Sequence, residues 1–219
     1  MPLFEKKLSY YSGDRIDMLP YISHDANRII EIGCGQGNFA AQLLKPTREV
    51  WGIEPNVEAA QIAAAKLHRV FNQKIEDCIH EIPDNYFDAI IFNDVLEHLL
   101  DPWHILKIIR VKLSQNGKVI VSIPNFRYVT NLFNVLIKKD WIYEDSGILD
   151  ATHVRFFTEK SIKRLFLQSN YQILKMEGIC KTTSFKGFML ASLINLFSLG
   201  YHQDIFFKQY VVIAKRANQ

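Results

Sequence analysis

A glycine-rich turn between a short apolar run and a helical pattern constrains the fold of this chain more than any other stretch. The run 29–32 is isoleucine at three of its four positions, which is typical of a buried parallel strand. Glycines follow at alternating positions, Gly33, Gly35 and Gly37, and apolar residues recur at helical spacing from Phe39. A turn without Cβ atoms lets the backbone approach a ligand closely, and the helix start offers free N–H donors. The stretch therefore predicts a strand–turn–helix unit with a ligand at the turn.

Two acidic residues near this turn indicate the charge of the ligand. The glycine spacing is G-x-G-x-G, whereas the dinucleotide fingerprint is G-x-G-x-x-G. Glu31 precedes the turn, and a carboxylate there attracts a cation and repels a pyrophosphate. Glu54 ends the next apolar run, 21 positions after Gly33, where α/β nucleotide-binding folds place a carboxylate that accepts hydrogen bonds from ribose hydroxyls. An NAD-dependent oxidoreductase is therefore disfavoured.

The glycine turn and its acid resemble motif I of class I S-adenosylmethionine (SAM) methyltransferases, which reads Asp/Glu-x-Gly-x-Gly-x-Gly. The resemblance implies SAM as methyl donor, S-adenosyl-L-homocysteine as product, and an α/β, Rossmann-like fold. That fold is a seven-stranded sheet, mostly parallel with an antiparallel last strand, and helices on both faces. The residues that we expect to contact the donor are Tyr11, Arg15, Glu31, Gly33, Cys34, Gly35, Gly37, Glu54, Pro55, Ile75, Glu76, Asn93 and Asp94.

Further apolar runs predict the remaining strands. They lie at 49–54, 70–75, 89–92, 118–123, 171–179 and 209–215. Ligands of open parallel sheets sit beyond the carboxyl ends of the strands, so Asn93 and Asp94 are expected beside the reacting methyl group. Tyr11 and Arg15, in a helical lead-in before the first strand, are candidates to cover the carboxylate end of the donor, with surface positions as the alternative. Ile75 is expected to pack against the adenine.

Two later segments point to a subgroup. The run Asp94-Val95-Leu96-Glu97-His98-Leu99 resembles the motif IV region of ubiquinone-biosynthesis-type methyltransferases. The combination of Trp-x-Tyr, Gly-x-Leu-Asp and His-Val-Arg-Phe-Phe-Thr at 141–158 is similar to a bacterial methyltransferase subgroup found among genes for surface polysaccharide and glycan modification. The resemblance covers about residues 8–180 and implies no particular acceptor.

The candidate catalytic residues are His153, His98, Asp94 and Arg155. A hydroxyl acceptor must lose its proton as the methyl group arrives, and an imidazole titrates in the right range, so His153 is the preferred general base. His98 and Asp94 are reserve candidates, and Arg155 could bind an acidic group of the acceptor. The alternative is that His153, Arg155 and Asp150 form a hydrogen-bonded staple that pins a lid. The sequence leaves base and staple equally open.

Two insertions extend what we expect to be one domain over residues 1–219. Residues 125–157, after the fifth strand, are predicted to form a lid on the acceptor side, and 180–204 an extra helical insertion. The apolar part of the second insertion, 185–199, is too short to span a bilayer. Core packing or a homodimer contact is favoured there over membrane contact.

Composition excludes several classes of function. Of 219 residues, 48% are hydrophobic and 22% charged, which is ordinary for a globular protein. The net charge of +3 comes from scattered Lys and Arg, so no basic stripe predicts a nucleic-acid partner. The three cysteines lie far apart, without disulfide density or zinc spacing, which indicates a reducing, cytoplasmic location and no metal site.

These observations predict a methyltransferase that transfers the SAM methyl group to an oxygen of a small molecule or glycan. The alternatives are N-methylation of an amino sugar, O-methylation of a carboxylate, including one on a peptide, and a non-catalytic SAM-binding module. The partners expected are therefore SAM and an acceptor.

Overall fold

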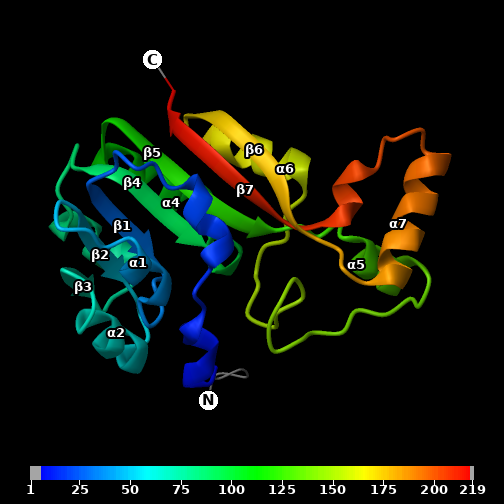
Figure 1. Ribbon diagram of the computed structural model, residues 1–219, viewed down its shortest axis with the longest axis horizontal. Helices are drawn as coiled ribbons and strands as arrows, with labels where there is room; N and C mark the ends of the chain where they lie inside the picture. The colour runs from blue at the N-terminus through cyan, green and yellow to red at the C-terminus, as the bar shows by residue number, and fades with distance from the viewer. Residues whose placement is uncertain (1–5, 218–219) are drawn as a thin grey trace.

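The apolar runs form one seven-stranded sheet, seen in the computed structural model, which describes residues 6–217 (Figure 1). The strands are β1 (Arg28–Ile32), β2 (Glu49–Ile53), β3 (Arg69–Phe71), β4 (Phe87–Asn93), β5 (Leu113–Pro124), β6 (Tyr171–Lys181) and β7 (Phe207–Arg216). Their order is β3-β2-β1-β4-β5-β7-β6. Strands β1 to β5 pair in parallel, and β7 runs antiparallel between β5 and β6. The predicted Rossmann-like topology is confirmed.

Alternate residues of the central strands face two separate cores. Ile30 and Ile90 belong to a cluster with residues of α4 (Pro102–Ile109) and α6 (Glu159–Gln168). Their neighbours Ile29 and Ile91 belong to the cluster on the other face. That cluster contains residues of two further helices, α1 (Asn38–Gln42) and α2 (Val57–Ala64). Burial on both faces explains why these strands are continuously apolar, and it confirms helices on both faces of the sheet.

Two predicted elements differ from the structure in type or length. The third strand ends at Phe71, and Ile75 instead begins the short helix α3 (Ile75–Cys78), so its assignment to a strand was wrong. The Asn72 side-chain amide donates to the carbonyls of Glu54 and Pro55, which turns the chain away from the sheet. The helical lead-in is two 3-10 segments, η1 (Leu8–Ser12) and η2 (Ile16–Tyr21).

The insertions after β5 and β6 pack on each other beside the end of the sheet (Figure 1). The first contains α5 (Val129–Leu136), followed by an irregular segment to residue 158. The second contains α7 (Phe185–Phe197) and η6 (Gln203–Phe206). Short 3-10 turns complete the elements, at Ile79–Glu81, Leu96–His98 and Arg110–Lys112.

The single domain predicted over 1–219 includes residues 1–5 and 218–219, which lie outside the described residues. Within residues 6–217, no helix combines the length and the apolar character that crossing a membrane requires.

Candidate functional site

The glycine turn is held between β2 and the N-terminal segment. The N–H groups of Gly33 and Cys34 both donate to the Ile53 carbonyl, at 2.8 and 3.0 Å. Gly35 has φ of +53°, and a Cβ there would lie 2.5 Å from the Tyr11 carbonyl oxygen. A side chain at this position is therefore excluded both by the left-handed backbone and by the close approach of η1. The turn is a rigid cradle, with no room for a bulkier residue at Gly35.

Glu54 fastens this turn to the start of α2. Its Oε2 accepts from the Gly35 N–H at 2.9 Å, and its Oε1 accepts from the Asn56 N–H at 2.8 Å. The residue is only 4% exposed, and burial raises the pKa of its carboxyl group. Burial and the nearby Glu54 charge also raise the pKa of the Tyr11 phenol. Each carboxylate oxygen retains a lone pair, so the group can accept two hydroxyl protons from a ribose as well.

Glu31 and Asn93 meet at the carboxyl ends of the neighbouring strands β1 and β4. The Asn93 side-chain N–H donates to Glu31 Oε1 at 2.8 Å. The other acceptors of the pair, Glu31 Oε2 and Asn93 Oδ1, are buried and have no hydrogen-bond partner among residues 6–217. Once Glu31 is ionised, these two buried acceptors without donors fit a ligand ammonium group, which offers three donors and no acceptor. The residues present therefore fit the amino end of SAM.

The protonation of Glu31 provides a test of this fit. Burial raises its pKa from 4.5 to about 8, so at pH 7 the carboxyl group is mostly protonated before the donor binds. A ligand ammonium beside it favours the carboxylate, so SAM binding is expected to release about one proton at pH 7. Calorimetry in buffers of different ionisation enthalpy measures this release. It should vanish in Glu31→Gln; a release that persists in that variant would assign the proton to another group.

Arg15 and Asp94 form an ion pair at the same edge of the sheet. Asp94, with φ of +55°, also accepts from Ser122 Oγ at 3.0 Å and from Gln209 Nε2 at 2.9 Å. The Arg15 guanidinium is shared with Asp17, at 2.9 Å. Both candidate residues thus lie at the predicted edge, but each already has a charged partner. The paired Asp94 carboxylate is a poor candidate for the general base.

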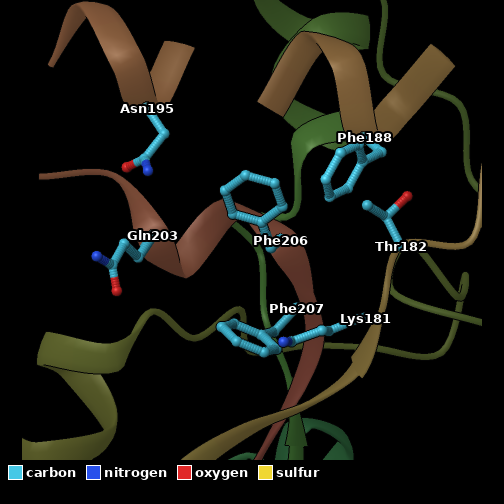
Figure 2. A pocket seen from close by; sticks show the side chains of 7 residues that line it. All are labelled: Lys181, Thr182, Phe188, Asn195, Gln203, Phe206 and Phe207. Atoms are coloured by element: carbon cyan, nitrogen blue, oxygen red, sulfur yellow. The ribbon is translucent and has the colours of Figure 1, made fainter. Parts of the chain in front are cut away.

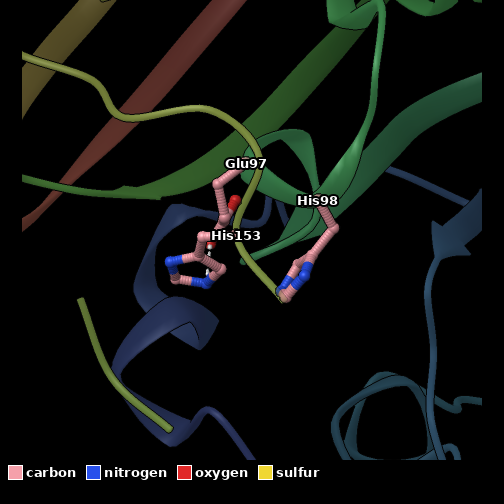
Figure 3. A group of neighbouring side chains, drawn as sticks. All are labelled: Glu97, His98 and His153. Carbon is pink, nitrogen blue, oxygen red and sulfur yellow. Dashed lines mark ion pairs between the residues drawn. The ribbon is translucent and has the colours of Figure 1, made fainter. Parts of the chain in front are cut away.

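The histidines His98 and His153 lie against each other beside a buried carboxyl group (Figure 3). Their ring centroids are 4.6 Å apart with the rings nearly perpendicular. Glu97 is 1% exposed, and its Oε1 lies 3.8 Å from His153 Nε2. Neither Glu97 side-chain oxygen has a hydrogen-bond partner within the described residues. His98 lies in the turn after β4 and His153 in the insertion after β5. These two segments therefore meet in one cluster, although the two histidines are 55 residues apart in the sequence.

Hydrogen bonds to carbonyl groups determine which imidazole nitrogens carry protons. His153 Nδ1 is 3.0 Å from the Ile148 carbonyl, and His98 Nδ1 is 3.3 Å from that of Thr152. A carbonyl only accepts, so we assign the proton of each neutral ring to Nδ1, which leaves Nε2 as a base. Burial lowers the pKa of both imidazoles, and for His98 the neighbouring His153 adds to the effect. Burial also raises the pKa of Glu97 well above its usual range.

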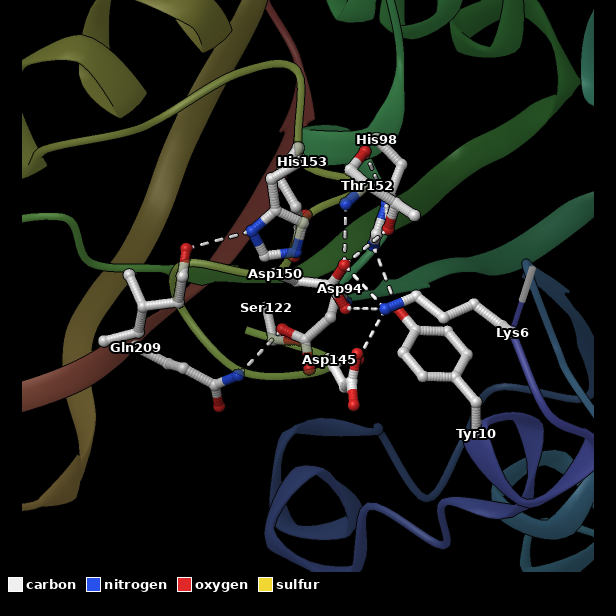
Figure 4. A network of polar contacts seen from close by, with 12 residues as sticks. Lys6, Tyr10, Asp94, His98, Ser122, Asp145, Asp150, Thr152, His153 and Gln209 are labelled. Atoms are coloured by element: carbon white, nitrogen blue, oxygen red, sulfur yellow. Dashed lines mark hydrogen bonds and ion pairs between the residues drawn. The ribbon is translucent and has the colours of Figure 1, made fainter. Parts of the chain in front are cut away.

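A polar network beside the histidines ties the N-terminal segment to the insertion after β5 (Figure 4). Lys6 Nζ lies 2.8 Å from Asp150 Oδ1, and that oxygen also accepts from the Thr152 N–H at 2.8 Å. The Tyr10 hydroxyl lies 3.4 Å from His98 Nε2. The segment is therefore pinned through Lys6 and Asp150.

The predicted staple of His153, Arg155 and Asp150 was wrong in its partners. The exposed Arg155 side chain donates to the Leu100 carbonyl at 2.5 Å and takes no part in the network. The Asp150 carboxylate binds Lys6 and Thr152, and only its backbone carbonyl contacts His153, through the His153 N–H. The Arg155 side chain thus points to Leu100 and not to the histidines, although the Arg155 N–H donates to the Glu97 carbonyl.

Glu97, His98 and His153 could also hold a metal ion, which the sequence did not suggest. Each offers one ligand atom, and the three atoms lie within 4.8 Å of one another. Imidazole nitrogens and a carboxylate suit divalent transition metals. The three residues do not show a metal-binding spacing in the sequence, because His153 lies 55 positions after His98.

The other predicted donor contacts differ in burial. The Cys34 thiol is buried against Gly52, where a Cβ would come within 2.5 Å of Sγ, and burial raises its pKa. Cys34 is therefore a packing residue with an unreactive thiol. Ile75 is 3% exposed at the start of α3, whereas Glu76 and Pro55 are exposed.

Ser122 and Gln209 were missed by the sequence analysis. Ser122 is near the end of β5, so the rule that selected Asn93 also applies to it. An antiparallel strand begins at the edge of the sheet where the parallel strands end. Gln209, the first residue of the predicted strand 209–215, could therefore have been predicted to lie at the site.

Comparisons with known proteins agree with this geometry. The sequence matches the methyltransferase domain family over residues 4–176. It is 31% identical over 101 residues to the ubiquinone biosynthesis O-methyltransferase of Bradyrhizobium diazoefficiens, covering 45% of this chain and 40% of that protein. The corresponding protein of Aeromonas salmonicida is 25% identical over 186 residues, with 81% and 73% covered. The chain thus spans less than half of the length of the first of these relatives and about three quarters of the second.

The fold is shared with solved structures at low sequence identity. A SAM-dependent methyltransferase from Archaeoglobus fulgidus superposes with a TM-score of 0.66 at 20% identity, covering 96% of this chain and 95% of that one.

Proposed function

We propose that this chain, which belongs to the methyltransferase domain family, is a SAM-dependent methyltransferase that methylates a hydroxyl oxygen of a small molecule or glycan. The observation that supports oxygen transfer is the His153 imidazole, whose Nδ1 is engaged by the Ile148 carbonyl at 3.0 Å. That bond leaves Nε2 able to take a proton from the acceptor. The relatives that are named O-methyltransferases support the same choice of atom.

We assign the donor to the edge of the sheet formed by β1, β2 and β4. Glu31 and Asn93 would accept hydrogen bonds from its ammonium group, and Glu54 from its ribose hydroxyls. When bound, SAM supplies a methyl group that is electrophilic because it is attached to a sulfonium. The chain therefore needs no group to activate the methyl, and its main contribution is to orient an acceptor and to remove the acceptor proton.

Removal of that proton is assigned to His153. A hydroxyl proton passes to Nε2, and the imidazole becomes cationic. Glu97 Oε1, 3.8 Å away and buried, is placed to stabilise that charge once it ionises. Because burial lowers the pKa of His153, the imidazole is neutral near pH 7 and ready to act as a base.

An aromatic cluster beside His153 supports an acceptor that contains a ring. Trp141 stacks on Phe126 with centroids 5.2 Å apart and meets Phe156 edge to face at 5.2 Å. Phe156 in turn lies 6.4 Å from the His153 ring. Trp141 is 38% exposed, so part of its indole is open to a ligand. Exposed indole faces bind sugar and aromatic rings, and both kinds of ring carry hydroxyl groups.

The dependence of kcat/KM on pH tests oxygen transfer against carboxylate methylation. For a hydroxyl acceptor the rate should rise as pH increases through the lowered imidazole pKa, below its usual value of about 6.5, and then level off. A carboxylate is already ionised near neutral pH and needs no base, so its profile would be flat.

A screen of hydroxylated sugars and phenols with methyl-labelled SAM supplies the acceptor for this profile. Mass spectrometry of the product should place the new methyl group on oxygen. Methylation of an amino nitrogen or of a carboxylate in this screen would contradict the proposal. Binding of SAM without turnover on any of these acceptors would favour a non-catalytic binding module.

A further inference from the structure

Helix α7 lies at one end of the molecule, away from the sheet (Figure 1). It is apolar around most of its circumference, and yet most of its large side chains are exposed. Its inner side, through Leu190, Ala191 and Ile194, packs on Tyr128 and Ile205. The outward-facing residues, which we call the α7 surface, are Phe185, Lys186, Phe188, Met189, Leu193, Leu196 and Phe197. A helix that is hydrophobic on all sides is normally covered by other atoms. The expected core packing therefore accounts for only one side of α7.

The exposed fractions are largest at the two ends of the helix. Phe185 is 78% exposed and Phe197 is 81% exposed. Leu199 and Tyr201, just after the helix, are also exposed large apolar residues. Exposed apolar patches of this kind mark sites of contact with another protein or with a membrane.

The charged residues nearest to the α7 surface are lysines, apart from the exposed Asp140 that directly follows Lys139. Lys181 and Lys186 are exposed at the N-terminal end of α7, and no acidic residue occurs between Lys181 and Asp204. Two more exposed lysines, Lys138 and Lys139, follow α5, which packs against α7. In a symmetric dimer formed through α7, the lysines of one copy would lie close to the lysines of the other copy and would repel them. The charge therefore favours an anionic partner over a second copy.

A pocket of about 310 Å³ lies at the inner edge of α7 (Figure 2). The rings of Phe188, Phe206 and Phe207 line it, with the Lys181 amine 5.6 Å from the Phe207 ring. The Thr182 hydroxyl, also in its lining, is buried and has no hydrogen-bond partner among residues 6–217. An apolar pocket with a cation and a free hydroxyl beside it suits an amphiphile with an anionic head group.

We propose that the α7 surface and its pocket dock the protein on the surface of a membrane that contains anionic lipids. The apolar side chains enter the head-group region while the lysines contact the phosphates, and α7 lies on the bilayer without crossing it. This proposal is independent of the acceptor of the methyl group.

Sedimentation with lipid vesicles tests the docking. The intact chain should bind vesicles of mixed phosphatidylglycerol and phosphatidylcholine, and much more weakly vesicles of phosphatidylcholine alone. In Phe185→Ser/Phe197→Ser binding should fall by about tenfold or more, because two exposed aromatic side chains no longer insert. Replacing Lys181 and Lys186 with glutamine should weaken binding roughly fivefold for each charge removed. Both substitutions are at exposed positions, so circular dichroism should show an unchanged fold.

The matched control is Leu167→Ser/Val111→Ser, which removes exposed apolar side chains from α6 and from the 3-10 turn after α4, and which should leave vesicle binding unchanged. An equal loss of vesicle binding in this control, or equal binding to vesicles without phosphatidylglycerol, would overturn the proposal.

Light scattering, which measures the oligomeric state, provides the other decisive outcome. The proposal would be wrong if the parent protein does not bind vesicles and forms a dimer that Phe185→Ser/Phe197→Ser dissociates. That result would show that a second copy covers α7.

Discussion

Alanine in place of Glu54 is expected to weaken SAM binding by roughly 10- to 150-fold. Hydrogen bonds to a charged group contribute about 1.5–3 kcal/mol, and the change removes those to the ribose. The structure adds a second reason, because the carboxylate also accepts from the N–H groups of Gly35 and Asn56. Its loss therefore releases the glycine turn from the start of α2, and the upper part of this range is expected. Titration calorimetry with SAM measures the change.

Glu58→Ala is the matched control for Glu54. It removes the same charge from the first turn of α2, where the side chain is exposed. SAM affinity should stay within about twofold of the parent protein, since surface charges near a helix end contribute only a few tenths of a kcal/mol. Unchanged affinity in Glu54→Ala itself would refute the ribose assignment.

The second large effect is expected at His153. Alanine there should reduce turnover by about 10²- to 10⁴-fold, the range of general base catalysis, while SAM affinity stays the same. The imidazole is 8% exposed and contacts Ile148 and Glu97, which lie outside the Glu31 and Glu54 contacts assigned to SAM. Steady-state kinetics with saturating SAM, together with calorimetry, separate the two quantities.

His153→Asn distinguishes a base from a structural staple. The asparagine side-chain N–H can replace Nδ1 as donor to the Ile148 carbonyl but cannot take a proton at Nε2. A base role predicts that asparagine is as inactive as alanine; restored turnover with asparagine would mean that the contact with Ile148 is what matters. His104→Ala, on the exposed side of α4, is the control and should retain full activity.

The features that were predictable from sequence are those set by local spacing. The three glycines, the preceding Glu31 and the strand-end Glu54 lie within 24 residues, so one strand–turn–helix–strand unit fixes their relation. The end of β3 was not predictable in the same way. Ile75 continues an apolar pattern, but the Asn72 side chain bonds to the Glu54 and Pro55 carbonyls and ends the strand early. Such a tertiary contact leaves no signal in periodicity.

The site residues that sequence reasoning could not relate to one another come from distant segments. Glu97 and His153 face each other only because the insertion after β5 returns to the end of β4, where the Val154 and Arg155 N–H groups donate to the Glu97 carbonyl. The contact of Lys6 with Asp150 spans 144 residues and depends on how the N-terminal segment crosses the site. Spacing rules identify which residues can do chemistry, but long-range packing decides which of them meet.

The internal position of β7 has a consequence for how the protein is made. Within residues 6–217, β7 follows all the other strands of the sheet along the chain, yet β5 and β6 are joined only through it. Until β7 emerges, β5 presents an open edge and β6 has no partner, and such edges pair readily with other nascent chains. Gln209, which holds Asp94, arrives with the same strand. The sheet can therefore close only after β7 has been synthesised, and a chain truncated before β7 would expose unpaired strand edges and would lack the Gln209 contact with Asp94.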